Sequence, residues 1–482
     1  MKLLQSARTQ SLSGHAAPTM SGWQLAVLLT AMFMGQFDFF VVNVAAPSLR
    51  VDLHASDGAL QLIVGGYAFA YAAGLVTGGR MGDLFGYRRI FVLGMAGFAV
   101  TSLLCSLAVT PAQLVAARLA QGLAAAAMLP QVLALITATI PGAMRPRAFA
   151  WYGVASGLGS IAGQVFGGAL ITANLADLGW RMIFLANVPI GVIAALLAWR
   201  MLPTTPRRQQ SSLDPIGAMG AAMTVAAILI PLTIGRSAGW PMWAWVCMVA
   251  AIPIAVATLR WERYLTDRGG TLPLFDITLL RLPIFRAGLL ANAAFMCFFG
   301  SFMFTLTLLL QFGLDLNAFQ AGLVFAPAGV AFSVSALIGR WLLARHGRRV
   351  LLIGSLLTAS SLGLIAINLS LTGTHTSLAL IVCLTALASF GNGIVLPSLI
   401  GAALVEVTSE RAGLAAGVLN TVQQFASASG VAIIGALFFA AIPDLRDMGD
   451  YAIGMTWATA ANFALVLLVT FQIRRVTPAD PK

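Results

Sequence analysis

The sequence predicts an all-α membrane protein with fourteen transmembrane helices, arranged as two six-helix bundles and an inserted two-helix hairpin. The 482 residues are 59% hydrophobic and 9% charged, whereas soluble domains carry about a quarter charged residues. Apolar runs long enough to cross about 30 Å of hydrocarbon recur along the whole chain. Basic residues gather in alternate connections between these runs, as the positive-inside rule describes.

Each predicted span is an apolar run of the length that a transmembrane helix needs, about 20 residues or slightly more. Short polar connections separate most of the runs. The fourteen runs lie near residues 22–44, 58–79, 90–109, 112–139, 148–172, 182–201, 215–235, 241–261, 285–311, 319–344, 350–370, 377–401, 412–441 and 452–473.

The basic residues predict the orientation of the chain. We assign 23 of the 28 Lys and Arg residues to one side of the membrane and four to the other, while Arg118 falls inside the fourth span. An even number of spans places both termini on the same side, and the rule identifies the basic side as the cytoplasm. The net charge of +12 therefore reflects membrane topology, and we expect no nucleic-acid partner.

Matching glycines indicate that the chain contains a repeat. Gly86 after span two and Gly347 after span ten are each followed within three residues by two arginines, and Gly163 in span five matches Gly430 in span thirteen. Transporters are often built from such repeats. Polar connectors around spans seven and eight mark these two spans as an insertion between the repeats.

This division gives five parts. They are a cytoplasmic N-terminal tail (1–21), an N-terminal six-helix bundle (22–201), connectors with the inserted hairpin (202–284), a C-terminal six-helix bundle (285–473) and a cytoplasmic C-terminal tail (474–482). No extramembrane stretch is long enough for a soluble catalytic domain, and no Walker loop, metal-ligand cluster or nucleophile motif is present. We therefore expect neither an enzyme nor a bound cofactor or metal, and an ion or substrate gradient must drive any transport.

Asp38 in span one and Arg118 in span four are the charges that we place deep in the hydrocarbon. Each costs about 2.5 to 3.5 kcal/mol at a helix centre, so the two together cost about 5 to 7 kcal/mol if unpaired. One interpretation is a structural ion pair between the two spans. The other is that Asp38 exchanges a proton and Arg118 modulates its proton affinity. Gln121, one turn from Arg118, can hydrogen-bond to Asp38 or to a substrate.

The loop after span two has the charge pattern of a gate. Asp83 precedes Arg88 and Arg89, so it can pair with them or with the N-terminal dipole of a neighbouring helix. Such a cluster would close the cytoplasmic face in one state and break in the other. The alternative is that the two arginines only anchor the topology.

A stripe of small residues runs along span five. Gly159, Gly163 and Gly167 recur every four residues, with Gly168 beside them, and such stripes allow close helix approach. The stripe is explained equally well by tight packing and by a hinge.

Aromatic, methionine and amide side chains are the candidates for substrate contact. Flat, apolar, cationic compounds suit aromatic faces and adaptable sulfur atoms, although the amides are explained equally well as interhelical hydrogen bonds. The predicted cavity residues are Phe39, Phe40, Asn43, Tyr67, Tyr71, Gln121, Met296, Gln311, Asn392, Asn420 and Gln424.

These motifs resemble the fourteen-span drug:proton antiporter branch of the major facilitator superfamily, which includes the EmrB-like and QacA-like multidrug exporters. The similar segments are "DFFVVNVAAP" (38–47), "GRMGDLFGYRR" (79–89), "RLAQG" (118–122), "GWRMIFLANVPIG" (179–191) and "LDPIG" (213–217). In register with the family's motifs are Asp38, Asn43, Pro47, Gly79, Asp83, Gly86, Arg88, Arg89, Arg118, Gln121 and Gly122.

Three residues depart from the family pattern, one in span five, one in the second gating loop and one next to Asp38. Gln164 stands where relatives have a proline that would bend span five. Ala344 replaces the aspartate of the second gating loop, so the charge lock should be stronger in the first half. Phe40 replaces a threonine and should make the site next to Asp38 narrower or more apolar.

The resemblance implies a proton-coupled antiporter that exports amphipathic drugs or toxic compounds across the bacterial inner membrane. The expected partners are the substrate, protons and the lipid bilayer, with the proton gradient as the energy source. One charge moving across 100 mV supplies about 2.3 kcal/mol, which corresponds to a substrate gradient of about 50-fold. The alternatives are a dedicated exporter of a single metabolite or antibiotic and a proton symporter for uptake. The sequence leaves open whether a periplasmic adaptor protein takes part.

Overall fold

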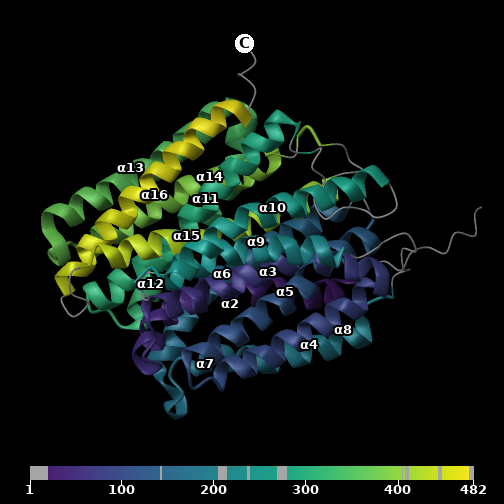
Figure 1. Cartoon of the computed structure of the whole chain (residues 1–482), viewed down its shortest axis with the longest axis horizontal. Coiled ribbons are helices and arrows are strands. Elements are labelled where there is room, and N and C mark those ends of the chain that lie inside the picture. Colours follow the sequence, from purple (N-terminus) through teal and green to yellow (C-terminus); the bar gives the residue numbers. More distant parts are fainter. Residues whose placement is uncertain are drawn as a thin grey trace, which may run out of the picture.

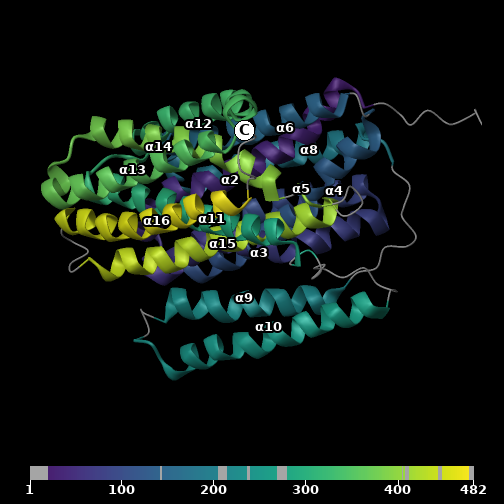
Figure 2. The same cartoon turned by 90° about the horizontal axis from the view of Figure 1, so that it is seen from above.

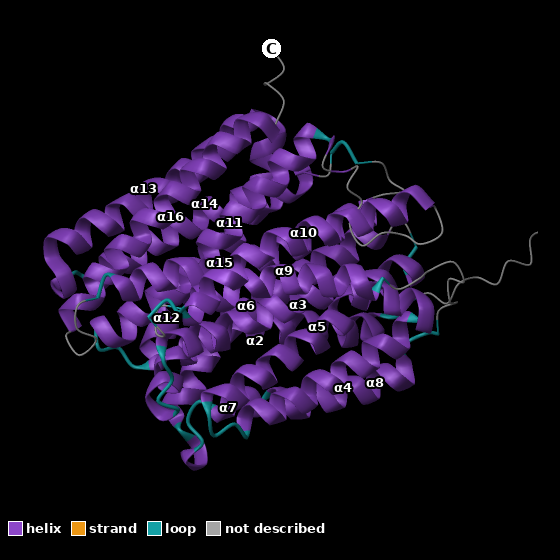
Figure 3. Cartoon of the chain, viewed as in Figure 1, coloured by secondary structure: helices purple, strands orange, loops and turns teal. Residues whose placement is uncertain are grey.

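The computed structural model describes residues 20–141, 144–204, 214–235, 239–268, 279, 281–403, 405–407, 412–442 and 448–476. Helices connected by short loops make up these residues (Figure 3). The α-helices are α2 (Gly22–Asp52), α3 (Asp57–Phe85), α4 (Tyr87–Ser106), α5 (Pro111–Thr139), α6 (Arg145–Ala173), α7 (Arg181–Leu185), α8 (Asn187–Met201), α9 (Pro215–Ile234), α10 (Met242–Arg268), α11 (Pro283–Leu308), α12 (Ala318–His346), α13 (Arg348–Thr372), α14 (Leu378–Ala403), α15 (Ala412–Ala440) and α16 (Met448–Val476).

The predicted fold class is confirmed. Thirteen described helical segments are long and apolar enough to cross a membrane, and the apolar part of α9 is shorter, Pro215–Pro231. The sixth predicted span contains two consecutive helices, α7 and α8, and the other predicted spans correspond to one α-helix each. The protein is therefore a multi-pass membrane protein.

The ends of α3 and α12 explain the repeat seen in the sequence. Ser56 caps α3 and Asn317 caps α12, each accepting a hydrogen bond from a backbone N–H in the first helical turn, as N-cap residues do. Both helices are 29 residues long and end at a glycine, Gly86 (φ +95°) and Gly347 (φ +58°). These positive φ angles favour glycine, and in both halves a single glycine links the helix to the next one.

The two halves have the same internal packing. In the first half α2 packs against α6, α3 against α5 and α4 against α8; in the second half α11 packs against α15, α12 against α14 and α13 against α16. Figure 1 shows the first half, purple to blue, below the second half, green to yellow. The most extensive contacts between the halves are those of α3 with α15 and of α6 with α12, and α2 also contacts α11 and α12.

The hairpin of α9 and α10 lies outside the two bundles, as Figure 2 shows. Its helix α9 contacts α3 of the first half and α15 of the second, so the hairpin lies against the seam between them. At its N-terminus, the Asp214 side chain accepts hydrogen bonds from the Gly217 backbone N–H and from the Trp261 indole, each at 2.9 Å. These bonds hold the start of α9 to α10.

Glycines let the paired helices approach closely. A Cβ atom on Gly163 of α6 would lie 2.6 Å from the carbonyl oxygen of Phe37 in α2, and a Cβ on Gly430 of α15 would clash with the Cys297 backbone in α11. Gly159 and Gly167 also face α2, whereas Gly168 faces the start of α12. The stripe in α6 therefore allows close contact with α2, and its last member contacts the other half.

Candidate functional site

A buried ion pair joins α2 and α5 in the middle of the first half. Asp38 and Arg118 are both completely inaccessible to solvent, and Arg118 Nη1 donates to Asp38 Oδ2. The Arg118 Nε also donates to the carbonyl oxygen of Ile63 in α3, at 3.2 Å. Because isolated charges are costly to bury, such a pair persists only with close geometry and additional hydrogen bonds.

Two amides complete the hydrogen bonds of the carboxylate. Gln121 Nε2 and Asn187 Nδ2 donate to Asp38 Oδ1 at 2.9 and 3.0 Å. The Gln121 oxygen accepts from Arg118 Nη1 at 2.6 Å, and its amide nitrogen also donates to Ser102 Oγ at 2.8 Å. Both oxygens of Asp38 are thus held by donors, and the network includes residues of α2, α3, α4, α5 and α8.

Aromatic rings enclose the guanidinium of Arg118. Its Cζ lies 4.7 Å from the ring centre of Tyr67 and 5.8 Å from that of Phe184, within the range of favourable cation–π contact. Arg118 Nη2 has no hydrogen-bond partner in the described part of the chain. The aromatic enclosure and the ion pair together keep this charge away from lipid.

The segment 179–191 holds this site from one side. At its start, the Trp180 indole and Arg181 Nη1 donate to Asp52 at the end of α2, each at 2.8 Å. Further along the same segment, Phe184 reaches Arg118 and Asn187 reaches Asp38. Asn187 and Ser102 were not among the residues predicted from the sequence, although Asn187 is a polar residue within a quoted motif.

The predicted gating residues lie at the turn between α3 and α4. Asp83 accepts a hydrogen bond from the Tyr87 hydroxyl at 2.5 Å, because Tyr87 lies four residues further along the chain, past the Gly86 turn. Arg88 donates to the carbonyl oxygen of Leu202 at 3.0 Å rather than to Asp83. In this conformation, therefore, Arg88 holds the turn to the end of α8. The remaining gating positions are Gly79, which faces α5, and the exposed Arg89.

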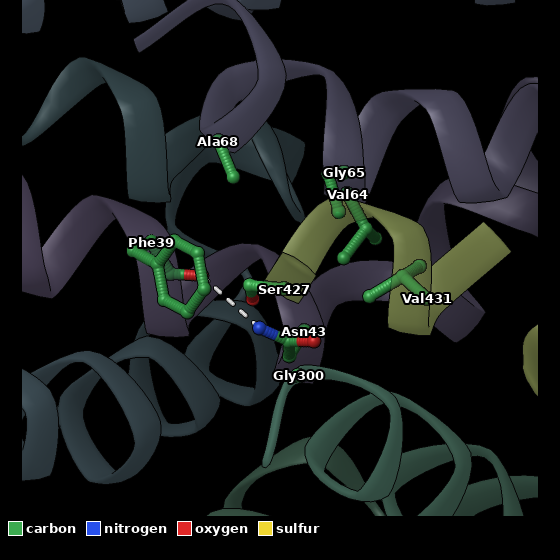
Figure 4. A pocket seen from close by; sticks show the side chains of 9 residues that line it. Phe39, Asn43, Val64, Gly65, Ala68, Gly300, Ser427 and Val431 are labelled. Atoms are coloured by element: carbon green, nitrogen blue, oxygen red, sulfur yellow. Dashed lines mark hydrogen bonds between the residues drawn. The ribbon is translucent and has the colours of Figure 1, made fainter. Parts of the chain in front are cut away.

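Helix α2 reaches the seam between the halves at Phe39, Phe40 and Asn43. Phe40 meets Phe299 of α11 edge to face, with ring centres 6.0 Å apart. Phe39 and Asn43 line a pocket that has room for about one water molecule. Figure 4 shows the pocket between α2, α3, α11 and α15, with the Asn43 amide donating to the Phe39 carbonyl oxygen at 3.0 Å. Among the described residues, Asn43 Oδ1 has no hydrogen-bond partner.

The other predicted cavity residues fall into three groups. Tyr71 and Asn420 share a hydrogen bond between α3 and α15, and Gln311 donates to the Val44 carbonyl oxygen at 2.8 Å, so these residues bridge the halves. Tyr67 and Gln121 belong to the Asp38 site. Partly buried Met296 packs against the core, Gln424 is partly buried, and Asn392 accepts from Thr358 inside the second half.

Several close contacts between the halves lie toward one end of the bundle. We call the end that carries the Gly86 and Gly347 turns the arginine-rich end. Contacts such as Gly168 with Ala318 lie toward the opposite end. Contacts between α6 and α12 continue toward the middle of the bundle, where a Cβ on Gly329 would lie 2.6 Å from the Ile161 side chain. The described part of the seam is therefore closed at the end opposite the Gly86 and Gly347 turns.

Two halves with the same internal packing, one of which contains a buried ion pair, are typical of membrane transporters built from repeats. The chain belongs to the Major Facilitator Superfamily, whose family model matches residues 28–218 and 214–431. Among the described residues, no group of three or more His, Cys, Asp or Glu side chains is placed to hold a metal ion.

Curated relatives match most of the chain. A probable actinorhodin transporter of Streptomyces coelicolor is 38% identical over 419 residues, covering 86% of this chain and 72% of the relative. The cephamycin export protein CmcT of Amycolatopsis lactamdurans is 33% identical over 440 residues, covering 89% of this chain and 88% of the relative.

The fold matches solved transporters. A bacterial homologue of the human lysosomal transporter Spinster, in an inward-facing and occupied conformation, aligns with a TM-score of 0.67 and 16% identity. The alignment covers 94% of this chain and 96% of that one. At this identity the likeness shows the fold alone.

Proposed function

We propose that the protein is a proton-coupled antiporter that exports amphipathic compounds of the antibiotic type across the bacterial inner membrane. The observation that carries this proposal is the Asp38–Arg118 pair, a titratable ion pair with no exposed surface inside a transporter bundle. Ionisable groups at membrane depth are costly and mark proton and substrate pathways. Relatives named for the transport of actinorhodin and the export of cephamycin support efflux as the direction.

The positive-inside rule favours the arginine-rich end as the cytoplasmic face, with both termini on that side. In this orientation contacts such as Gly168 with Ala318 close the outer end of the seam, which supports an inward-facing state. An amphipathic compound would enter the seam from the cytoplasm or from the inner leaflet. The aromatic side chains Phe39 and Phe40 would meet its apolar part near the closed end of the seam.

Proton exchange at Asp38 supplies the coupling in this proposal. A proton on Asp38 removes the charge that holds Arg118, so the hydrogen bonds of Gln121 and Asn187 must rearrange around a neutral acid. Because these partners lie on different helices, the change reaches α2, α5 and α8 together. Protonation from the outside would accompany substrate release, and deprotonation toward the cytoplasm would restore the ion pair for the next substrate.

A dedicated exporter of one compound is the second candidate. The tightness of the seam favours it, since Phe40 packs against Phe299 and the pocket beside Asn43 has room for about one water molecule. A narrow binding site between fixed aromatic rings discriminates between substrates of different shape more strongly than a wide cavity does.

Resistance measurements in an efflux-deficient bacterial host test the function. Cells expressing the wild type, Asp38→Asn or an empty vector are exposed to a panel of cationic dyes and antibiotics of several classes. We expect raised inhibitory concentrations for several amphipathic compounds with the wild type and loss of this effect with Asp38→Asn. Resistance to a single compound supports the dedicated exporter, and greater sensitivity than the vector control would contradict export.

A further inference from the structure

Arg50, near the outer end of α2, contacts both halves of the transporter. Its Nη2 donates to Asp57 Oδ1 of α3 at 2.9 Å, within the first half. Its Cζ also lies 5.3 Å from the ring centre of Phe439 in α15 and 5.9 Å from that of Phe312 after α11. Both rings belong to the second half, so the guanidinium links the halves at the closed end.

The two aromatic partners are held firmly in the second half. Phe439 is 1% exposed and meets Phe438 edge to face at 5.3 Å, while Phe312 stacks on Tyr451 with ring centres 5.4 Å apart. Cation–π attraction strengthens when the groups are removed from water, and Arg50 itself is only 17% exposed. The rings therefore form a fixed receptor for a cation from the other half.

A local distortion places Phe312 at this point. The α-helix of α11 changes to a π-helix over Leu309–Gly313, and such short π segments occur frequently at functional sites. Within it, Gln311 donates to the Val44 carbonyl oxygen of α2 at 2.8 Å. Two consecutive residues of the π segment thus contact α2, one by a hydrogen bond and one by its ring.

We propose that Arg50, Phe312 and Phe439 form a latch that holds the outer end of the transporter closed. The inference rests on the proposed transport cycle, in which this end must open to release substrate. The contact can break at low cost because Asp57 moves with Arg50 in the same half, so the arginine keeps its counter-ion after the rings separate. The contacts of Arg50 with the two rings stabilise the closed state, and its ion pair with Asp57 remains in the open state. Such a contact can be made and broken in every cycle.

Another arginine at the same end provides a matched control. Arg181 pairs with Asp52 at 2.8 Å and lies 4.4 Å from the ring centre of Trp180. It therefore makes an ion pair and a cation–π contact, as Arg50 does, but all three of these residues belong to the first half. Substituting Arg181 therefore removes an ion pair and a cation–π contact within the first half and leaves the contacts between the halves in place.

Distances between spin labels at the outer end test the latch. In a background whose native cysteines are replaced by serine, labels on His54→Cys and Ser377→Cys report the separation of the halves in lipid nanodiscs. We expect Arg50→Gln and Phe439→Leu each to raise the ratio of separated to closed populations at least about fivefold. Arg181→Gln should leave this ratio within about twofold of the wild type.

Two outcomes would overturn the latch. One is an unchanged distance distribution in both Arg50→Gln and Phe439→Leu, and the other is an equal shift in the Arg181→Gln control. The measurement needs no substrate and no pH gradient. Its result therefore stands apart from the resistance panel, and failure of the latch is distinguishable from failure of the proposed export function.

Discussion

Replacing Asp38 by asparagine should destabilise the protein strongly, because it leaves the buried Arg118 without a counter-ion. Removing one partner of a buried ion pair costs about 3 to 5 kcal/mol. The remaining close partners of the Arg118 guanidinium would be neutral, the Ile63 carbonyl at 3.2 Å and the Gln121 oxygen at 2.6 Å. They satisfy hydrogen bonds but do not balance the charge.

The expected size of the effect follows from the length of the chain. Unfolding entropies of about 2.1 cal/mol/K per residue give about 1 kcal/mol/K for the whole chain if it unfolds as one unit. A loss of about 3 to 5 kcal/mol then lowers Tm by roughly 3 to 5 °C. The double variant Asp38→Asn with Arg118→Met should recover most of this loss, because no unpaired charge remains buried.

Thermal unfolding in detergent, followed by tryptophan fluorescence, measures these differences. Asp52→Asn is the control, since the Asp52 side chain is 49% exposed in its pair with Arg181 and exposed pairs contribute only about 0 to 1 kcal/mol. If Asp38→Asn lowers Tm no more than Asp52→Asn, the pair does not hold a buried charge. If the double variant lowers Tm by the sum of the decreases caused by Asp38→Asn and by Arg118→Met alone, Asp38 and Arg118 act independently. The described site would then be wrong.

Two further predictions concern helix contact and positioning. Gly163→Val should lower Tm by several degrees, because the new Cβ would lie 2.6 Å from the Phe37 carbonyl oxygen. Gly153→Val in the same helix should leave Tm unchanged, because an added Cβ there meets no atom of the described residues within 4 Å. Equal effects of the two substitutions would contradict the close approach. Asn187→Ala removes a 3.0 Å hydrogen bond to Asp38 and should lower the free energy of unfolding by about 1.5 to 3 kcal/mol. The same variant should reduce transport by folded protein, and full transport would exclude a positioning role.

The sequence predicted the fold because the bilayer limits the possibilities. Length, hydropathy and the distribution of basic residues identify transmembrane segments without knowledge of their packing. The cost of burying charge singled out Asp38 and Arg118, and the structure brings together these two residues, which lie 80 positions apart. Gln121 could be added because it lies one helical turn from Arg118.

Packing between helices was harder to predict. An asparagine such as Asn187 carries no charge, and in a bundle that is apolar on every side the helical period does not say which face a residue occupies. For the same reason the sequence left open whether Asn392 lines the cavity or makes an interhelical hydrogen bond, and in the structure it accepts one from Thr358 within the second half. Arg50 was counted only as a charge outside the membrane, since its aromatic partners lie more than 260 positions further along the chain.

Transport by purified protein in lipid vesicles tests the central claim most directly. The vesicles carry an imposed pH gradient and a compound to which the protein confers resistance, and wild type is compared with Asp38→Asn at a temperature where both remain folded. We predict that the gradient drives accumulation by the wild type and that Asp38→Asn loses this accumulation while still binding the compound. Gradient-driven accumulation by Asp38→Asn at the wild-type rate would contradict the account.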